Sequence, residues 1–258
     1  MLLFAACASG PPDVPYPVFI QTDTLPDAFL AELPGIRAKQ LAGNPDTRRS
    51  SNRLLLPPQW SFSTGAAPDK SVEIYVLAGE IRLGEFALGS GGYAYVPPGS
   101  TGLNIQTESG ALLLYFLDDE NAASVIRTPI ILSRDILQWQ AISDDPNDFG
   151  VSAKELRFDP GSVARTELIK IEAGVTRPWM KSSVLEEGYL VEGSYEHSEC
   201  VQGEILTAGY TQGGYYHRPA GAVNGSLGSN NTAAAVWLVR TLSHAKTTFV
   251  DECAVAEK

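Results

Sequence analysis

The chain has 258 residues, of which 44% are hydrophobic and 19% charged, so it carries enough apolar material for one large core or two of ordinary size. This composition excludes a chain that is mainly disordered. The 19 lysines and arginines stand against 30 aspartates and glutamates, which gives a formal charge of -11. Because such a charge repels phosphate backbones and anionic lipid headgroups, we expect no nucleic-acid partner.

Residues 1–17 form a leader-like segment, in which a brief apolar stretch ends in small residues and Cys7 and a Pro-rich stretch follows. It resembles the end of a bacterial lipoprotein signal, which implies lipidation of Cys7 and an exported protein of the periplasm or cell envelope, held to a membrane only by that lipid. The apolar stretch is shorter than the usual about 7–15 residues, and no basic residues precede it. A cytoplasmic protein with an ordinary N-terminus is therefore the alternative.

Two cysteines besides Cys7, namely Cys200 and Cys253, form an even pair. An oxidising compartment would permit a disulfide between them, and otherwise they are two separate thiols. The sequence leaves both readings open.

Segments of the first half recur in the second half in the same order, which indicates a duplicated supersecondary unit. Residues 35–41 (GIRAKQL) recur as 150–156 (GVSAKEL), residues 73–79 (EIYVLAG) as 187–193 (EGYLVEG), and residues 91–99 (GGYAYVPPG) as 213–221 (GGYYHRPAG). The offset grows from 114 (73 to 187) to 122 (91 to 213), so the second copy has eight extra residues. These predict a longer hairpin over residues 194–212.

Each copy contains short apolar runs bounded by Gly and Pro, which are typical of strands. The expected strands are 53–56, 72–77, 93–96 and 111–116 in the first copy and 166–171, 189–191, 215–218 and 233–239 in the second. Residues 118–148 form an acidic connection, with a short helix expected around residues 134–139. Since antiparallel sheets must close or pair their edges, we predict an all-β fold of two small barrels. The predicted domains are 18–120 and 150–245, with the leader 1–17, a linker 121–149 and a tail 246–258.

The second copy resembles the cupin superfamily. The spacing of the first cupin motif runs from Gly174 through Met180, Ser182 and Glu186 to Gly193, and that of the second runs from Gly213 through Pro219 and Gly221 to Asn224, with Gly228 at the place of the terminal Asn. The first copy keeps Gly79, Gly91 and residues 97–99. More narrowly, residues 154–160, Trp179, residues 186–193 and Arg218–Pro219 resemble a group of bacterial bicupins whose domains are similar to the cupin domain of the anti-sigma factor ChrR. The resemblance implies two tandem cupin (double-stranded β-helix, jelly-roll) barrels, often with a divalent metal, and no common reaction.

The metal-ligand positions of the motif are largely lost. Where cupins have three histidines and a glutamate, the second copy has Met180, Ser182, Glu186 and Asn224, and the first has Ala66, Pro68, Val72 and Gly102. A transition metal needs several strong donors that converge on it. We therefore expect no metal or other cofactor, with only a weak divalent site in the second barrel left open.

The chain has three histidines, and none stands at a ligand position of the motif. His217 shares one face of its strand with Tyr215. If that face is the barrel interior, Tyr215, His217, Glu186 and Asn224 line one polar cavity, and His217 with Glu186 is the candidate acid–base pair. Otherwise His217 packs on the outside. We expect His197 in a solvated acidic loop and His244 at the surface.

The leading functional hypothesis is a small-ligand-binding or sensory bicupin with its ligand in the second barrel. The candidate ligand-binding residues are Met180, Ser182, Glu186, Tyr215, His217 and Asn224. The first barrel is then expected to be filled by apolar side chains. The alternatives are an enzyme acting in the second barrel (a metal-dependent oxygenase or isomerase, or a metal-free lyase) and a cell-envelope interaction protein. A homo-oligomer is compatible with each of them.

Overall fold

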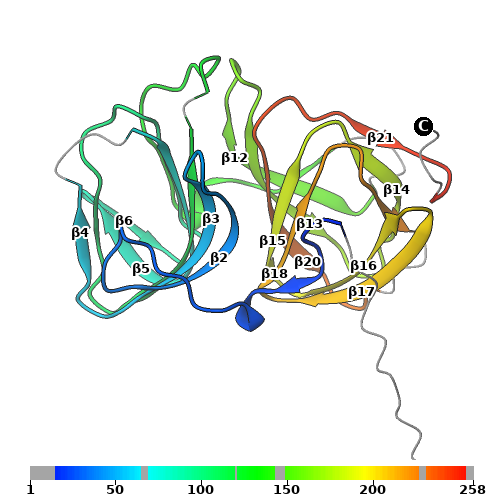
Figure 1. Ribbon diagram of the computed structural model, residues 1–258, viewed down its shortest axis with the longest axis horizontal. Helices are drawn as coiled ribbons and strands as arrows, with labels where there is room; N and C mark the ends of the chain where they lie inside the picture. Colours follow the sequence, from blue (N-terminus) through cyan, green and yellow to red (C-terminus); the bar gives the residue numbers. More distant parts are fainter. Residues whose placement is uncertain (1–14, 65–68, 120, 143–148, 227–230, 254–258) are drawn as a thin grey trace, which may run out of the picture.

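In the computed structural model, the described residues are 15–64, 69–119, 121–142, 149–226 and 231–253. Cys7, Ala66, Pro68 and Gly228 lie outside these ranges. The described chain is all-β, as predicted, and forms two barrels side by side (Figure 1). None of its helices is long and apolar enough to cross a membrane.

The first barrel is built from eight antiparallel strands. They are β2 (Arg37–Asn44), β3 (Arg49–Leu56), β4 (Ser61–Ser63), β5 (Ser71–Leu83), β6 (Phe86–Gly89), β7 (Tyr93–Val96), β8 (Asn104–Gln106) and β9 (Ala111–Asp118). The main path of its sheet runs β7-β5-β9-β3-β2. Off this path, β6 and β8 pair with β5, and β4 pairs with β8.

The second barrel is formed by two sheets. Its strands are β12 (Val151–Phe158), β13 (Arg165–Ile171), β14 (Arg177–Ser182), β15 (Glu186–Glu192), β16 (Ser194–Val201), β17 (Glu204–Thr211), β18 (Gly214–Arg218), β19 (Val223–Ser226), β20 (Ala235–Thr241) and β21 (Thr247–Phe249). One sheet has the order β18-β15-β20-β13-β12, and the other has the order β17-β16-β19-β14-β21. The hairpin predicted over residues 194–212 is confirmed as β16 and β17.

Each barrel receives a short strand from the segment that precedes the other barrel. Strand β1 (Ile20–Gln21) pairs with β18, and β10 (Ile130–Leu132) pairs with β7. A single 3-10 turn follows each of them, η1 (Thr22–Thr24) and η2 (Arg134–Ile136), and β11 (Gln140–Ala141) then pairs with β12. The short helix expected around residues 134–139 is present as η2 but is only one 3-10 turn long, because the chain returns to an extended conformation at Leu137.

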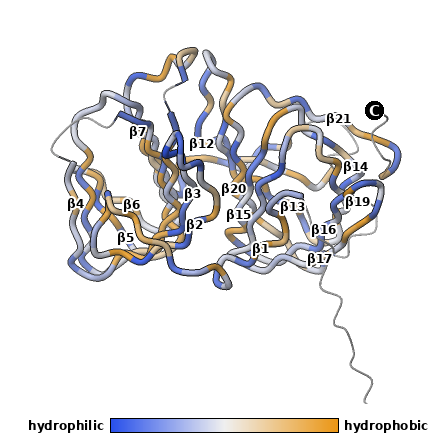
Figure 2. The backbone as a smooth tube through the Cα atoms, in the orientation of Figure 1, coloured by the Kyte–Doolittle hydropathy of each residue, from blue (hydrophilic) through white to orange (hydrophobic). Residues whose placement is uncertain are grey.

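Apolar side chains form three clusters, one in each barrel and one between them. In Figure 2 the hydrophobic stretches lie mainly along the strands and the hydrophilic ones along the connecting loops. The inter-barrel cluster contains Tyr75, Tyr93 and Phe116 from the first barrel and Tyr189 and Tyr215 from the second. The two sheets that face each other are therefore buried on both faces, one against the interior of their own barrel and one against the other barrel. Most antiparallel sheets expose one face to solvent.

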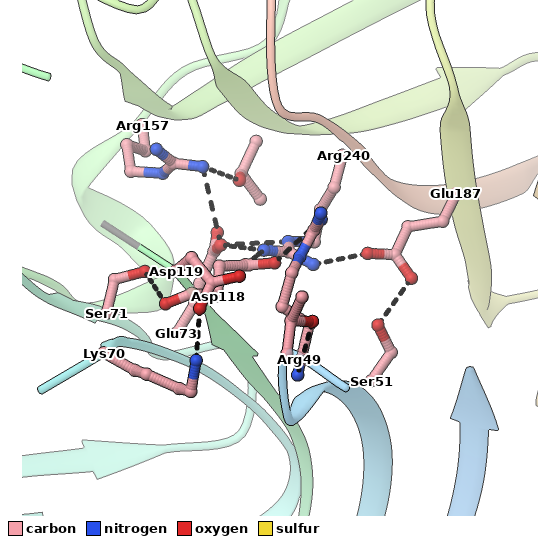
Figure 3. A network of polar contacts seen from close by, with 12 residues as sticks. Arg49, Ser51, Lys70, Ser71, Glu73, Asp118, Asp119, Arg157, Glu187 and Arg240 are labelled. Carbon is pink, nitrogen blue, oxygen red and sulfur yellow. Dashed lines mark hydrogen bonds and ion pairs between the residues drawn. The ribbon is translucent and has the colours of Figure 1, made fainter. Parts of the chain in front are cut away.

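A buried ionic network lies in the same interface (Figure 3). The guanidinium of Arg240 on β20 binds Glu73 of the first barrel, with Nε 2.9 Å from Oε2, and also binds Glu187 and Asp118. Arg240, Glu73 and Glu187 have side chains exposed by only 2%, 2% and 8%. Burial acts to raise the pKa of Glu73, but the charges of Arg240 and Arg157 outweigh it and lower that pKa.

A disulfide joins Cys200 at the end of β16 to Cys253 near the C-terminus, and their Cα atoms are 5.4 Å apart. It ties the segment that follows β21 to the extra hairpin of the second barrel. The sequence left open whether these cysteines form a disulfide or remain two separate thiols, and in the structure they are bonded.

Candidate functional site

A pocket of about 190 Å³ lies inside the second barrel. Its apolar wall is aromatic: the ring of Trp237 is edge-on to Tyr195 and Tyr210 and tilted against Tyr216, with ring centroids 5.1 to 6.0 Å apart. Polar side chains of β14, β15, β16, β18 and β19 complete the lining. An apolar cavity with a few convergent polar groups is the usual form of a small-molecule site.

Four predicted residues meet in this pocket. Met180 and Asn224 are direct cross-strand neighbours on β14 and β19, and Ser182 and Glu186 line the same cavity. The Asn224 amide also donates to the Met180 carbonyl oxygen at 3.3 Å. The four residues at the motif's ligand positions therefore lie around one cavity.

The other two predicted residues are not in the pocket. On β18 the interior positions are Tyr216 and Arg218, so Tyr215 and His217 face the opposite side. The Tyr215 hydroxyl donates to Glu187 at 2.9 Å in the inter-barrel network. The structure thus brings Glu186 and Asn224 together but separates them from Tyr215 and His217. His217 lies on the outer face of its barrel, which is the second of the two alternatives given for it.

His197 was expected in a solvated loop, and that expectation is wrong. It lies on β16, is 6% exposed and lines the pocket, with Nε2 3.2 Å from Asn224 Oδ1. Burial, followed by the nearby Arg218 charge, lowers the pKa of His197 from 6.5 to about 3. Its imidazole is therefore neutral at physiological pH and is not poised for proton transfer there.

The centre of the pocket wall is an ion cluster around Arg218, which the motif spacing does not predict. Its Nη2 is 2.6 Å from Glu199 Oε1, its Nε is 3.2 Å from both Glu199 oxygens, and its Nη1 is 3.1 Å from Glu186 Oε1. The same Nη2 is 3.4 Å from His197 Nε2. Glu199 is completely buried, and the Arg218 side chain is 4% exposed.

Further contacts fix this cluster. The Tyr216 hydroxyl donates to Glu186 Oε1 at 2.8 Å, and the Tyr216 ring lies under the guanidinium, 4.0 Å from Arg218 Cζ. Tyr16, from the segment before β1, donates to Glu199 Oε2 at 3.2 Å. Burial acts to lower the pKa of Arg218, but the charges of Glu199 and Glu186 and the contact with Tyr216 raise it well above its ordinary value. Arg218 is thus a permanent internal cation.

The sequence does contain a signal for the buried face of β16, namely the alternation of residues that is typical of a strand. Tyr195, His197 and Glu199 alternate along β16, as side chains on one face must. Glu186 and Arg218 are direct cross-strand neighbours. Their acidic surroundings in the sequence suggested a surface loop and hid this alternation.

The residues of the pocket do not suit the divalent metal that many cupins hold. A thioether, a hydroxyl and an amide, from Met180, Ser182 and Asn224, are weak ligands for it. The carboxylates of Glu186 and Glu199 already bind the Arg218 guanidinium, which would repel a second cation. Among the described residues, no three His, Cys, Asp or Glu side chains are grouped so as to hold a metal ion.

The first barrel differs from its expected solid apolar filling. An apolar cluster does occupy its interior, but a recess of about 1060 Å³ opens at one end, and Val72 at the Glu186-equivalent position lines it. Gly102 is exposed and does not line the recess. Residues of the 25–33 loop and of the turn between β2 and β3 also line this recess, so its wall extends beyond the barrel strands.

Solved structures similar to this one have the cupin fold. A proposed dioxygenase of Nostoc punctiforme aligns over 90% of this chain and 85% of its own, with a TM-score of 0.72 and 18% identity. The YlbA protein of E. coli aligns over 88% and 91%, with a TM-score of 0.67 and 13% identity. Oxalate decarboxylase of Bacillus subtilis, which has Mn(II) centres, aligns over 90% and 78%, with a TM-score of 0.59 and 15% identity.

At such identities these likenesses show the fold alone. No curated protein sequence matches the chain. The family described as "Domain of unknown function (DUF4437)" matches residues 33–246, which include both barrels except β21 and every residue of the Arg218 cluster except Tyr16. The chain is therefore a cupin-fold protein that belongs to the DUF4437 family.

Proposed function

We propose that this protein is a bicupin that binds a small polar molecule in its second barrel, as a binding or sensory protein, without a metal ion. The observation that carries the proposal is the Arg218 guanidinium, held by Glu186 and Glu199 inside a pocket that Met180, Ser182 and Asn224 also line. Arg218 supplies a fixed positive charge among the motif side chains. The ligand then meets a preformed polar wall instead of an open coordination position.

The size of the pocket limits the ligand. Its volume of about 190 Å³ is below the roughly 300–1,000 Å³ of pockets for drug-sized molecules. Side chains of both charges line it: the carboxylates of Glu167 and Glu186, and the cations of Arg177, Lys181 and Arg218. A small ligand that carries both hydrogen-bond donors and acceptors fits this mixture better than a long apolar one.

Metal analysis tests the first half of the proposal. Protein purified without chelators or a metal-binding tag should carry well under one transition-metal ion per chain. Added zinc or manganese should not raise its melting temperature, because a ligand that binds only the folded state must stabilise it. Stoichiometric metal that disappears in Glu186→Gln would contradict the proposal.

Ligand screening tests the second half. Small polar metabolites that raise the melting temperature of the wild type should fail to do so in Ser182→Phe, in which the ring enters the pocket. The control is His217→Ala, whose side chain lies on the other face of β18, and it should keep every hit. A hit that survives Ser182→Phe, or that is lost in His217→Ala, would place the ligand elsewhere.

We propose further that the protein works in an oxidising, exported compartment. The disulfide between Cys200 and Cys253 supports this, because such bonds persist outside the reducing cytosol. Thiol trapping of protein taken from cells should find Cys200 and Cys253 oxidised. If Cys7 is lipidated, cell fractionation should find the protein in the membrane fraction. Reduced Cys200 and Cys253 in a cytosolic pool would contradict it.

A further inference from the structure

The recess of the first barrel has the form of a second, chemically different binding site. Its volume is about 1060 Å³, against about 190 Å³ for the pocket of the second barrel. Leu30, Leu33, Phe62, Leu103 and Leu117 give it an apolar wall. It also has an aromatic side chain at its rim, because Phe29 lines the recess and is 83% exposed.

One buried polar side chain points into this apolar space. Tyr115 on β9 is 3% exposed and lines the recess, and no hydrogen bond joins its hydroxyl to any described residue. Its hydroxyl oxygen is not among the fully buried polar atoms without a partner, so it is accessible from the recess and can form a hydrogen bond with a ligand there. Its counterpart in the second barrel is Val239, because Ile74 pairs with Tyr115 as Gly188 pairs with Val239. Val239 lines the second-barrel pocket, so this position faces the ligand cavity in both barrels.

A second polar atom lies beside Tyr115. Asn52 on β3 is its direct cross-strand neighbour and is completely buried. Its amide nitrogen donates to Ser50 Oγ at 2.9 Å, while its Oδ1 has no hydrogen-bond partner. Asn52 does not itself line the recess, so the free hydrogen-bonding group in the lining is the Tyr115 hydroxyl. The lining combines the apolar side chains named above with charged ones, among them Glu32, Arg48 and Lys70.

The cations along the recess already have partners in this chain. Arg48 Nη2 is 3.0 Å from Asp69, Arg49 Nη2 is 3.4 Å from Asp118, and Lys70 binds Asp119. A ligand with a net negative charge would have to compete with these carboxylates. The recess therefore favours a neutral molecule over an anion.

We propose that the first barrel binds a neutral, largely apolar molecule whose single hydrogen-bonding oxygen, as in a ketone, ester or alcohol, meets the Tyr115 hydroxyl. The apolar body lies along Leu33, Leu103 and Leu117. This site is independent of the one proposed in the second barrel, which takes a smaller and more polar ligand.

Calorimetric titration with 2-decanone tests the proposal. The wild type should bind one equivalent, and Tyr115→Phe should weaken binding about fivefold, as expected for the loss of one neutral hydrogen bond. Decane, which lacks the oxygen, should bind wild type and Tyr115→Phe alike, and decanoate should bind more weakly than the ketone. The matched control is Tyr75→Phe, the same chemical change in the inter-barrel cluster, which should leave the affinity for 2-decanone unchanged.

Two variants that fill the recess complete the test. Leu117→Trp and, nearer the mouth, Leu30→Trp should abolish binding, and circular dichroism identifies which of them remains folded. The Ser182→Phe variant of the second barrel should bind 2-decanone as the wild type does. The proposal is overturned if the wild type binds no 2-decanone, if binding persists in a folded filling variant, or if Ser182→Phe removes it.

Discussion

Arg240 lies over the ring of Phe116, with its Cζ 3.9 Å from the ring centroid, and the two residues occupy equivalent positions in the two barrels. Phe116 is the cross-strand neighbour of Glu73, and Arg240 is the cross-strand neighbour of Glu187. Each glutamate also accepts a hydrogen bond from a tyrosine of its own barrel, Glu73 from Tyr93 at 2.6 Å and Glu187 from Tyr215 at 2.9 Å. The duplication thus placed two equivalent carboxylates in one interface, and Arg240 binds both, while Arg157 is a second cation 3.6 Å from Glu73.

Replacing Arg240 by methionine should lower the free energy of unfolding by about 3–5 kcal/mol, because Glu73 and Glu187 would remain buried without their main counter-charge. Urea unfolding at pH 7 measures this loss. The loss should shrink on acidification, since protonation removes the uncompensated charge. As a control, Arg48→Met removes an ion pair with side chains 74% and 76% exposed and should cost less than about 1 kcal/mol. Equal losses in the two variants would show that the interface network contributes nothing beyond an exposed pair.

The Arg218 cluster can be tested by a double-mutant cycle. Arg218→Met should destabilise the protein strongly, since it leaves the fully buried Glu199 without its counter-charge. Adding Glu199→Gln should recover part of the loss, because the remaining side chain is neutral and of the same shape. The coupling is obtained from the urea unfolding of the two single variants and the double variant. Additive losses would mean that Glu199 and Arg218 do not stabilise each other.

His197 should give the protein an acid-sensitive stability. Its pKa is about 3 in the folded state against 6.5 otherwise, so between these values the unfolded chain binds more protons. Its contribution is therefore complete above pH 6.5 and is lost as the pH falls, with a slope of up to about 1.4 kcal/mol per pH unit. The unfolding free energy of His197→Gln, measured from pH 7 to 4.5, should fall less steeply than that of the wild type. Identical slopes in the wild type and His197→Gln would refute the assignment.

The disulfide should stabilise the second barrel by about 4 kcal/mol, the chain-entropy value for the 53-residue separation of Cys200 and Cys253. The double variant Cys200→Ser/Cys253→Ser should show this loss in urea unfolding. Dithiothreitol should lower the melting temperature of the wild type but not that of the double variant. An effect of the reductant on both proteins would point to Cys7 or to another cause.

Gly188 makes room for the Tyr216 ring. A Cβ at this glycine would lie 2.3 to 2.6 Å from three ring and hydroxyl atoms of Tyr216, which are nearer than atoms can pack. Gly188→Ala should therefore cost about 1–3 kcal/mol and displace the Tyr216 hydroxyl from Glu186. Gly209→Ala, on a strand with nothing within 4 Å of the added atom, is the matched control and should change stability little. Comparable losses in both would attribute the effect to the strand backbone and not to the ring.

The repeated glycines are the part of the sequence that predicted the fold best, for a steric reason. Gly79 and Gly193 have φ of +77° and +86°, and a Cβ at either would lie 2.3 or 2.2 Å from the backbone oxygen of the residue just before β9 or β20. No other residue fits there, so both copies keep the glycine and the turn around it remains recognisable. The strands between such fixed points could then be assigned from their apolar runs.

The phase of β18 could not be predicted in the same way. Its Tyr215 and Tyr216 are both buried, one between the barrels and the other inside the second barrel, so alternation gave no preferred face. The burial of His197 and Glu199 could not be predicted for a different reason. Their charged sequence neighbours are typical of a solvated loop, although β16 buries both side chains. Strands β1 and β10 have two and three residues, too few for any periodic signal.

The pairing of β1 with β18 and of β10 with β7 also bears on the origin of the chain. Ile20 pairs with Tyr215 as Leu132 pairs with the equivalent Tyr93, so the two strands are exchanged reciprocally. Two separate copies of a one-barrel chain that made the same exchange would form a closed, two-fold symmetric dimer with swapped N-terminal strands. A gene fusion of that dimer would produce the present connectivity, whereas a tandem copy of a self-contained barrel would return each strand to its own sheet. In a fragment that ends at residue 119, β7 would lack its β10 partner and present an open edge, at which such a half would associate with another copy of itself.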